Sequence, residues 1–140
     1  MFLKNELFTF NGETITLFEL SGLQRINHLT HLAEQAKIAQ ALEGNEEVIT
    51  SELVAMNIRN SALLVAMSIW HNDRIGKTET ELHEQVLSEW PVTAISEAEQ
   101  RIKALSCMVV PAEEKTVTGE VVSPEATEEE LIPEKSSPAS

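Results

Sequence analysis

The chain has 140 residues, the size of one ordinary domain, so a two-domain enzyme is not expected. It carries 10 Lys and Arg against 23 Asp and Glu, a formal net charge of −13 at pH 7. Because nucleic acids and anionic lipids are bound through basic patches, we expect neither a nucleic-acid nor a membrane partner. With a single cysteine and no apolar stretch approaching the roughly 20 residues that span a bilayer, the composition predicts a soluble cytosolic protein.

The composition changes at Pro111 and divides the chain into a body, residues 1–110, and a tail, residues 111–140. The tail holds four of the five prolines, eight Glu and two Lys, and no aromatic residue. Such a segment cannot bury enough apolar surface to offset the entropy of ordering it, so we expect a disordered acidic tail. Two interpretations of it remain open: a solvating segment that keeps the protein soluble, or a tether that carries a partner or a further domain.

The body opens with the pattern of a β-hairpin. Two runs of alternating apolar and polar residues flank Asn11-Gly12, a pair that supplies the positive φ angles of a two-residue type I′ turn. Phe8 and Phe10 mark one strand, and Ile15 and Leu17 mark the other. Because two strands alone are marginally stable, this hairpin is expected to pack on helices.

Four helices are predicted to follow. Ser21 can cap the first with Gln24 closing a capping box, and Gly44 is expected just past its end. Its apolar residues fall on one side, where they form a stripe for burial: Ile26, Leu29, Leu32, Ala33 and Ala36. The second helix is expected to start at Thr50 or Ser51. It runs into the sequence SALLVAMSIWHN, which is apolar almost all round and therefore predicts a central buried helix.

Thr78 and Glu81 form a second capping box, which predicts the start of the third helix. Pro91 ends or sharply turns that helix, because proline lacks the amide donor. A fourth helix is predicted from residue 93 to residue 108. The sequence therefore predicts a mainly α fold, with an N-terminal hairpin packed on a bundle of about four helices and a disordered acidic tail. The residues expected to anchor the core are Phe8, Phe10, Ile26, Leu29, Leu64, Trp70, Trp90 and Ile95.

No pattern of catalytic or ligand-binding residues emerges. Gly76-Lys77-Thr78 resembles the end of a phosphate-binding loop, but His71 stands where the first glycine of that loop belongs. His28 and His31 are spaced for a shared metal, yet they lie away from the apolar stripe and are interpreted as solvated. His71 is expected to cap the second helix, His83 to be exposed, and Cys107 to be unreactive. We therefore expect no catalytic residue, no cofactor and no metal; one of the two tryptophans could instead contact a partner.

The sequence resembles one known family. The carrying stretches are MFLKNELFTFNGETITLFELSGLQRINHL, then LLVAMSIWHN, then VLSEWPVTAISEAEQRI. In this order they are similar to the tail assembly protein G family, the tail assembly chaperones of lambda-like long-tailed bacteriophages. The resemblance implies a non-catalytic chaperone that acts in the host cell cytoplasm and is absent from the finished virion.

The resemblance also implies partners. Members of the family are thought to coat the tape measure protein and keep it in solution. A programmed ribosomal frameshift makes a minor, extended product whose second domain recruits tail tube subunits. Self-association of the coating copies would be compatible with this role. The alternative from another class is an acidic inhibitor, a nucleic-acid mimic that binds a basic host enzyme, with which the net charge is compatible.

Overall fold

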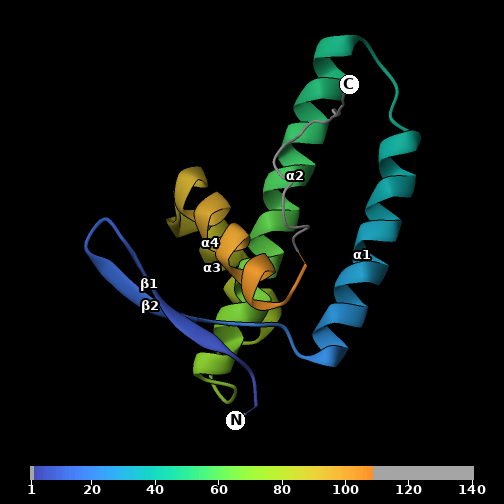
Figure 1. Ribbon diagram of the computed structural model, residues 1–140. Helices are drawn as coiled ribbons and strands as arrows, with labels where there is room; N and C mark the ends of the chain where they lie inside the picture. Colours follow the sequence, from blue (N-terminus) through green and yellow to red (C-terminus); the bar gives the residue numbers. More distant parts are fainter. Residues whose placement is uncertain (1, 109–140) are drawn as a thin grey trace, which may run out of the picture. The chain divides into compact units, whose positions relative to one another are not determined.

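The computed structural model describes residues 2–108, so the predicted tail lies outside the described residues. Within these residues the fold is mainly α and opens with a two-stranded antiparallel hairpin (Figure 1). The predicted hairpin on a four-helix body is confirmed. The elements are β1 (Asn5–Phe10), β2 (Glu13–Phe18), α1 (Gly22–Gln40), α2 (Glu46–Ile69), the short 3-10 helix η1 (Trp70–Asn72), α3 (Glu79–Glu89) and α4 (Val92–Leu105).

The hairpin turns where the sequence predicts. Asn11 and Gly12 both have positive φ, 51° and 82°, as a type I′ turn requires. Phe8 pairs with Ile15 and Phe10 with Glu13, which fixes the register of the two strands. The hairpin is attached to the central helix at Ser68: the Phe18 N–H donates to Ser68 Oγ at 2.7 Å, and the Ser68 hydroxyl donates back to the Phe18 carbonyl at 2.8 Å.

Helix α2 is the centre of the body. Its second half, the buried segment Ser61–Ile69, is covered on nearly all sides, and Ala62, Leu64 and Val65 are completely buried. The hairpin, α3 and α4 all pack against α2, while α1 runs antiparallel beside it, with its first turns next to the end of α2 (Figure 1). The helix begins at Glu46, four residues before the predicted Thr50. The Asn45 side chain accepts the Val48 N–H at 2.9 Å and caps the helix there.

By length and composition alone, Glu46–Asn72 is long and apolar enough to cross a membrane, with a mean hydropathy of 1.3. The expectation that no stretch reaches this length is therefore wrong. Half of the apolar window is buried inside the body, which is the position of a core helix.

The remaining helix boundaries follow local chemistry. The predicted capping boxes at Ser21 and Thr78 are both present. Helix α3 ends before Trp90, whose extended backbone leads into Pro91, and α4 begins one residue before its predicted start. Helix α1 ends at Gln40, four residues before Gly44, so this glycine is not its cap.

The eight predicted core anchors are distributed unevenly. Phe8, Leu64 and Ile95 are buried, and Phe10, Trp70 and Trp90 are half-buried. Phe8 stacks on Trp90 with ring centroids 6.2 Å apart. Ile26 and Leu29 are 61% and 51% exposed, so their assignment to the core is wrong. The reason is the orientation of α1, which turns this side of the helix to solvent.

Leu64→Ala tests the position of the buried segment. The substitution should lower the free energy of unfolding by about 2–5 kcal/mol, because the surrounding helices cannot close the cavity that it leaves. Leu53→Ala lies in the same helix at a side chain that is 44% exposed. It should cost less than about 1 kcal/mol and serves as the matched control. Urea denaturation of both variants measures the difference; equal effects would contradict the assignment of α2 as the core helix.

Candidate binding surface

Helix α1 packs on the body through polar side chains. Gln24 and His28 are both 4% exposed, and they are the buried residues of this helix. His31 lies on the same face, where its Nε2 pairs with Asn60 Oδ1 of α2 at 2.8 Å. The interpretation of His28 and His31 as solvated surface residues is therefore wrong. They form the inner face of α1.

Gln24 connects four elements through one side-chain amide. Its Nε2 donates to the Met67 carbonyl of α2 at 2.8 Å and to Glu79 Oε2 of α3 at 2.7 Å. Its Oε1 accepts the Ser21 N–H at 3.1 Å, and it pairs with His71 Nε2 of η1 at 2.9 Å. All the hydrogen-bonding capacity of a buried amide is thus used, which offsets the cost of burying it.

His71 extends this network rather than capping α2. Its Nδ1 lies 2.8 Å from Arg74 Nη2, and a guanidinium can only donate. Nδ1 must therefore accept, which places the proton on Nε2, from where it is donated to Gln24 Oε1. The network requires a neutral imidazole ring.

Burial acts on both inner histidines in the same direction. Desolvation lowers the pKa of His28 below its usual 6.5, and the nearby charges of Lys103 and Arg25 lower it further. Desolvation also lowers the pKa of His71, with a further contribution from Arg74. His28 Nδ1 is buried without a hydrogen-bond partner among the described residues.

Since the inner face of α1 is polar, its apolar residues face outward. Leu23, Ile26, Leu29 and Leu32, which we call the α1 stripe, recur every three residues. They are 68%, 61%, 51% and 37% exposed. The first half of α2 also exposes apolar side chains, at Val48, Leu53 and Val54. Full burial of such a side chain would contribute about 1.5–3 kcal/mol of free energy, which these exposed residues do not gain. A group of exposed apolar side chains of this kind is typical of an interaction surface.

The residues considered for catalysis or metal binding do not come together. Among residues 2–108, no group of three or more His, Cys, Asp or Glu side chains is placed to hold a metal ion. In the Gly76 turn, Asp73 Oδ1 accepts the N–H groups of Ile75 and Gly76, at 3.2 and 3.1 Å. A carboxylate thus occupies the amides that a phosphate would need. His83 pairs with the Arg59 carbonyl at 2.9 Å, and Cys107 is exposed.

The fold and its outward stripe define a class of protein that acts by binding another macromolecule. Comparison with known proteins narrows this class. The family profile described as "Bacteriophage lambda tail assembly chaperone, TAC, protein G" matches residues 1–126. The chain belongs to this family of phage tail assembly chaperones, whose members are not enzymes and act in the infected host cell during virion assembly.

Individual relatives agree with the profile. Tail assembly protein G of Escherichia phage N15 is 36% identical over 149 aligned positions, which cover all of both chains. Tail assembly protein G of Escherichia phage lambda is 41% identical over 115 positions, or 77% of this chain and 79% of the relative. Tail assembly protein GT of phage N15 is 36% identical over 86% of this chain, but the match covers only 49% of GT. No solved structure matches the chain.

The two buried histidines, His28 and His71, predict a pH dependence of stability. Because their pKa values are lowered on folding, the unfolded chain binds protons first as the pH falls below 6.5. Their contribution to stability is therefore complete above pH 6.5 and is lost as the pH falls. Urea denaturation measures the free energy of unfolding at pH 7 and at about pH 5.5. Between these two pH values, that free energy should fall less in His28→Gln and in His71→Gln than in the wild type. His83→Gln is the control, and its free energy of unfolding should fall as much as that of the wild type. If it fell equally in the His28 and His71 variants too, the role of these two buried histidines in the pH dependence would be contradicted.

Proposed function

We propose that this chain coats the tape measure protein of its phage through the α1 stripe and keeps it in solution until the tail tube assembles. The observation that carries the proposal is the orientation of α1. A helix that buries glutamine and histidine while exposing four leucine and isoleucine side chains is arranged to bind an apolar partner.

The geometry of the stripe suits a helical partner. A tape measure protein is long, helical and apolar on its flanks, so it aggregates unless it is covered. The α1 stripe follows an i, i+3 ridge over about 14 Å of helix axis. Such a ridge packs into the i, i+4 grooves of another helix, with a crossing angle near 20°.

The charge of the chain supports the same role. The net charge of the chain is −13, and none of its charged residues belongs to the α1 stripe. Coated complexes would therefore repel one another and remain in solution. Within α1 itself, Arg25 and Lys37 outnumber Glu34, so the stripe is not surrounded by the acidic charge that dominates the rest of the chain.

An extended product completes the proposed mechanism. Relatives named G and GT both match this chain, and GT is about twice as long as the part that matches. We propose that a ribosomal frameshift likewise produces a minor extended form of this chain. Residues 111–140 would then link the coating body to a domain that recruits tail tube subunits. The chaperone would act in the host cytoplasm and leave before the virion is complete, without a cofactor or a metal.

Ile26→Glu combined with Leu29→Glu tests the coating surface. Both side chains are exposed, so the thermal midpoint of the chain alone should stay within a few degrees of the wild type. Co-expressed tape measure protein should lose most of its solubility, because charges would face its apolar flanks. Ile75→Glu changes an apolar residue that is 96% exposed but lies outside α1, and it serves as the matched control. Full solubilisation by the double variant would refute the α1 stripe as the client site.

Deletion of residues 112–140 separates the two proposed roles. The truncated short form should still bind and solubilise the tape measure protein, because the body carries the apolar contacts. The same deletion within the extended product should reduce the yield of tails, because the tether would be lost. Pull-down and plaque assays measure the two effects. Co-purification of a basic enzyme in place of the tape measure protein would favour the inhibitor hypothesis.

A further inference from the structure

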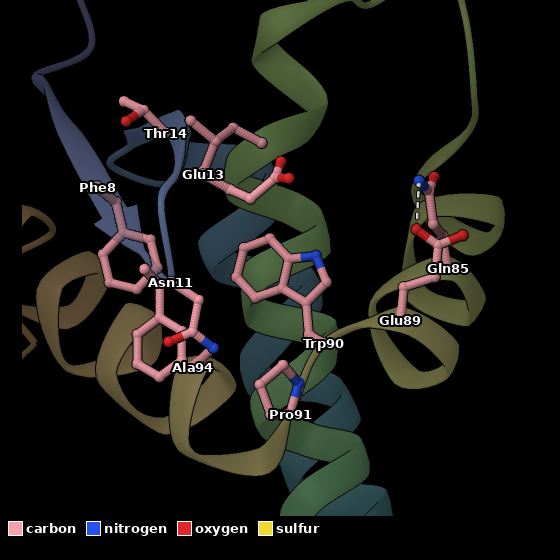
Figure 2. Close-up of a pocket in the computed structure, with 11 residues that line it drawn as sticks. Phe8, Asn11, Glu13, Thr14, Gln85, Glu89, Trp90, Pro91 and Ala94 are labelled. Atoms are coloured by element: carbon pink, nitrogen blue, oxygen red, sulfur yellow. Dashed lines mark hydrogen bonds between the residues drawn. The ribbon is translucent and has the colours of Figure 1, made fainter.

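A second apolar surface lies at the other side of the body, between the hairpin and the start of α4. A cavity of about 510 Å³ opens there, which we call the Trp90 cleft. Figure 2 shows the Trp90 ring at its centre, with Phe8 and the turn residue Asn11 on one side and Gln85 and Glu89 of α3 on the other. The volume lies within the range of about 300–1,000 Å³ that is typical of pockets that enclose a ligand group.

The walls of the Trp90 cleft are aromatic and its rim is acidic. Phe8, Phe10 and Trp90 supply the aromatic surface, and Glu13 and Glu89 supply the carboxylates. Gln85 Nε2 donates to Glu89 Oε1 at 3.3 Å, while Gln85 Oε1 is buried without a partner among the described residues. The cleft therefore fits a segment in which an apolar side chain stands close to a cation. A rotation of the Gln85 amide would also let its unpaired Oε1 accept a hydrogen bond from that cation.

The chain carries such a segment at its beginning. Phe2 is fully exposed, and Lys4 follows two residues later with its side chain in solvent. The backbone of Lys4 is fixed, because its N–H donates to Glu19 Oε1 at 2.7 Å and its carbonyl accepts the Glu19 N–H at 2.9 Å. Phe2 therefore projects from a defined point of the hairpin.

Neither Phe2 nor Lys4 lies in the Trp90 cleft of its own chain. Strand β1 separates Lys4 from the turn by six residues, or about 20 Å of extended chain. On the hairpin, the cleft is lined by Phe8 and by residues of the turn end between Phe10 and Ile15. Residues 2–4 span only about 10 Å, so they do not extend from Lys4 to the turn. Figure 1 shows the same separation, with the N-terminal end of β1 far from the turn.

We propose that the segment Phe2–Lys4 of one copy inserts into the Trp90 cleft of a second copy. Phe2 packs against Trp90 and Phe10, and Lys4 pairs with the carboxylates of Glu13 and Glu89. The contact joins two different surfaces, so each copy keeps one free segment and one free cleft. Such a head-to-tail contact propagates into an open chain, or closes into a ring if the rotation between copies permits. Neither surface includes the α1 stripe, so each assembled copy would keep its stripe free.

The proposal is tested by complementation between two variants of the full chain. Phe2→Ser removes the inserting side chain but keeps the cleft. Glu13→Lys with Glu89→Lys reverses the charge of the cleft but keeps the segment. In sedimentation velocity, the wild type should form species larger than a monomer, and their size should grow with concentration. Each variant alone should associate at least about tenfold more weakly than the wild type. An equimolar mixture should form 1:1 dimers and nothing larger, because only one productive pairing remains.

The controls separate this contact from general stickiness. Ile75→Ser removes another exposed apolar side chain and should associate like the wild type. Circular dichroism should show unchanged helix content in all variants, because Phe2 and Glu13 are exposed and Glu89 lies on the surface of α3. A wild type that stays monomeric at all concentrations, or a mixture that stays monomeric, would overturn the proposal. The assay uses the chain alone, so its failure would leave the proposed binding of the tape measure protein untouched.

Discussion

The fold depends on the need to cover the buried segment Ser61–Ile69 on all sides. This segment is apolar almost all round, so one packing partner cannot bury it. This segment is covered by the hairpin, α3 and α4. These elements contribute Phe8, Val86 and Ile102 to the same core. Helix α1 is the element that remains, and it packs on the body through Gln24, His28 and His31. Its polar face meets the body, and its leucines stay in solvent.

The same constraint explains how far the sequence could predict the structure. Local signals are satisfied within a few residues of chain: Asn11-Gly12 sets the hairpin turn, and Ser21 and Thr78 close their capping boxes with Gln24 and Glu81. These features were predicted correctly, because neighbouring residues decide them. The start of α2 was missed although Asn45 and two following glutamates signal it.

The orientation of α1 could not be predicted from periodicity. An amphipathic stripe normally indicates the buried face, and that rule assigned Ile26 and Leu29 to the core. A second signal was present: polar residues recur at positions 24, 28 and 31 on the opposite face. Only tertiary partners, such as the Met67 carbonyl and His71, decide which of the two faces lies inside. Family membership followed from the sequence, whereas the surface that we propose for the client could be found only in the fold.

The polar attachment of α1 has a dynamic consequence. Hydrogen bonds between Gln24, His31 and their partners can be replaced by bonds to water at little net cost, unlike the packing around Leu64. Lifting α1 from the body breaks these hydrogen bonds and leaves the packing around Leu64 in place. Its amide hydrogens are expected to exchange through a local opening of low free energy, while those of the buried segment exchange only on global unfolding. We therefore expect a cooperative core and a helix α1 that opens before the core does.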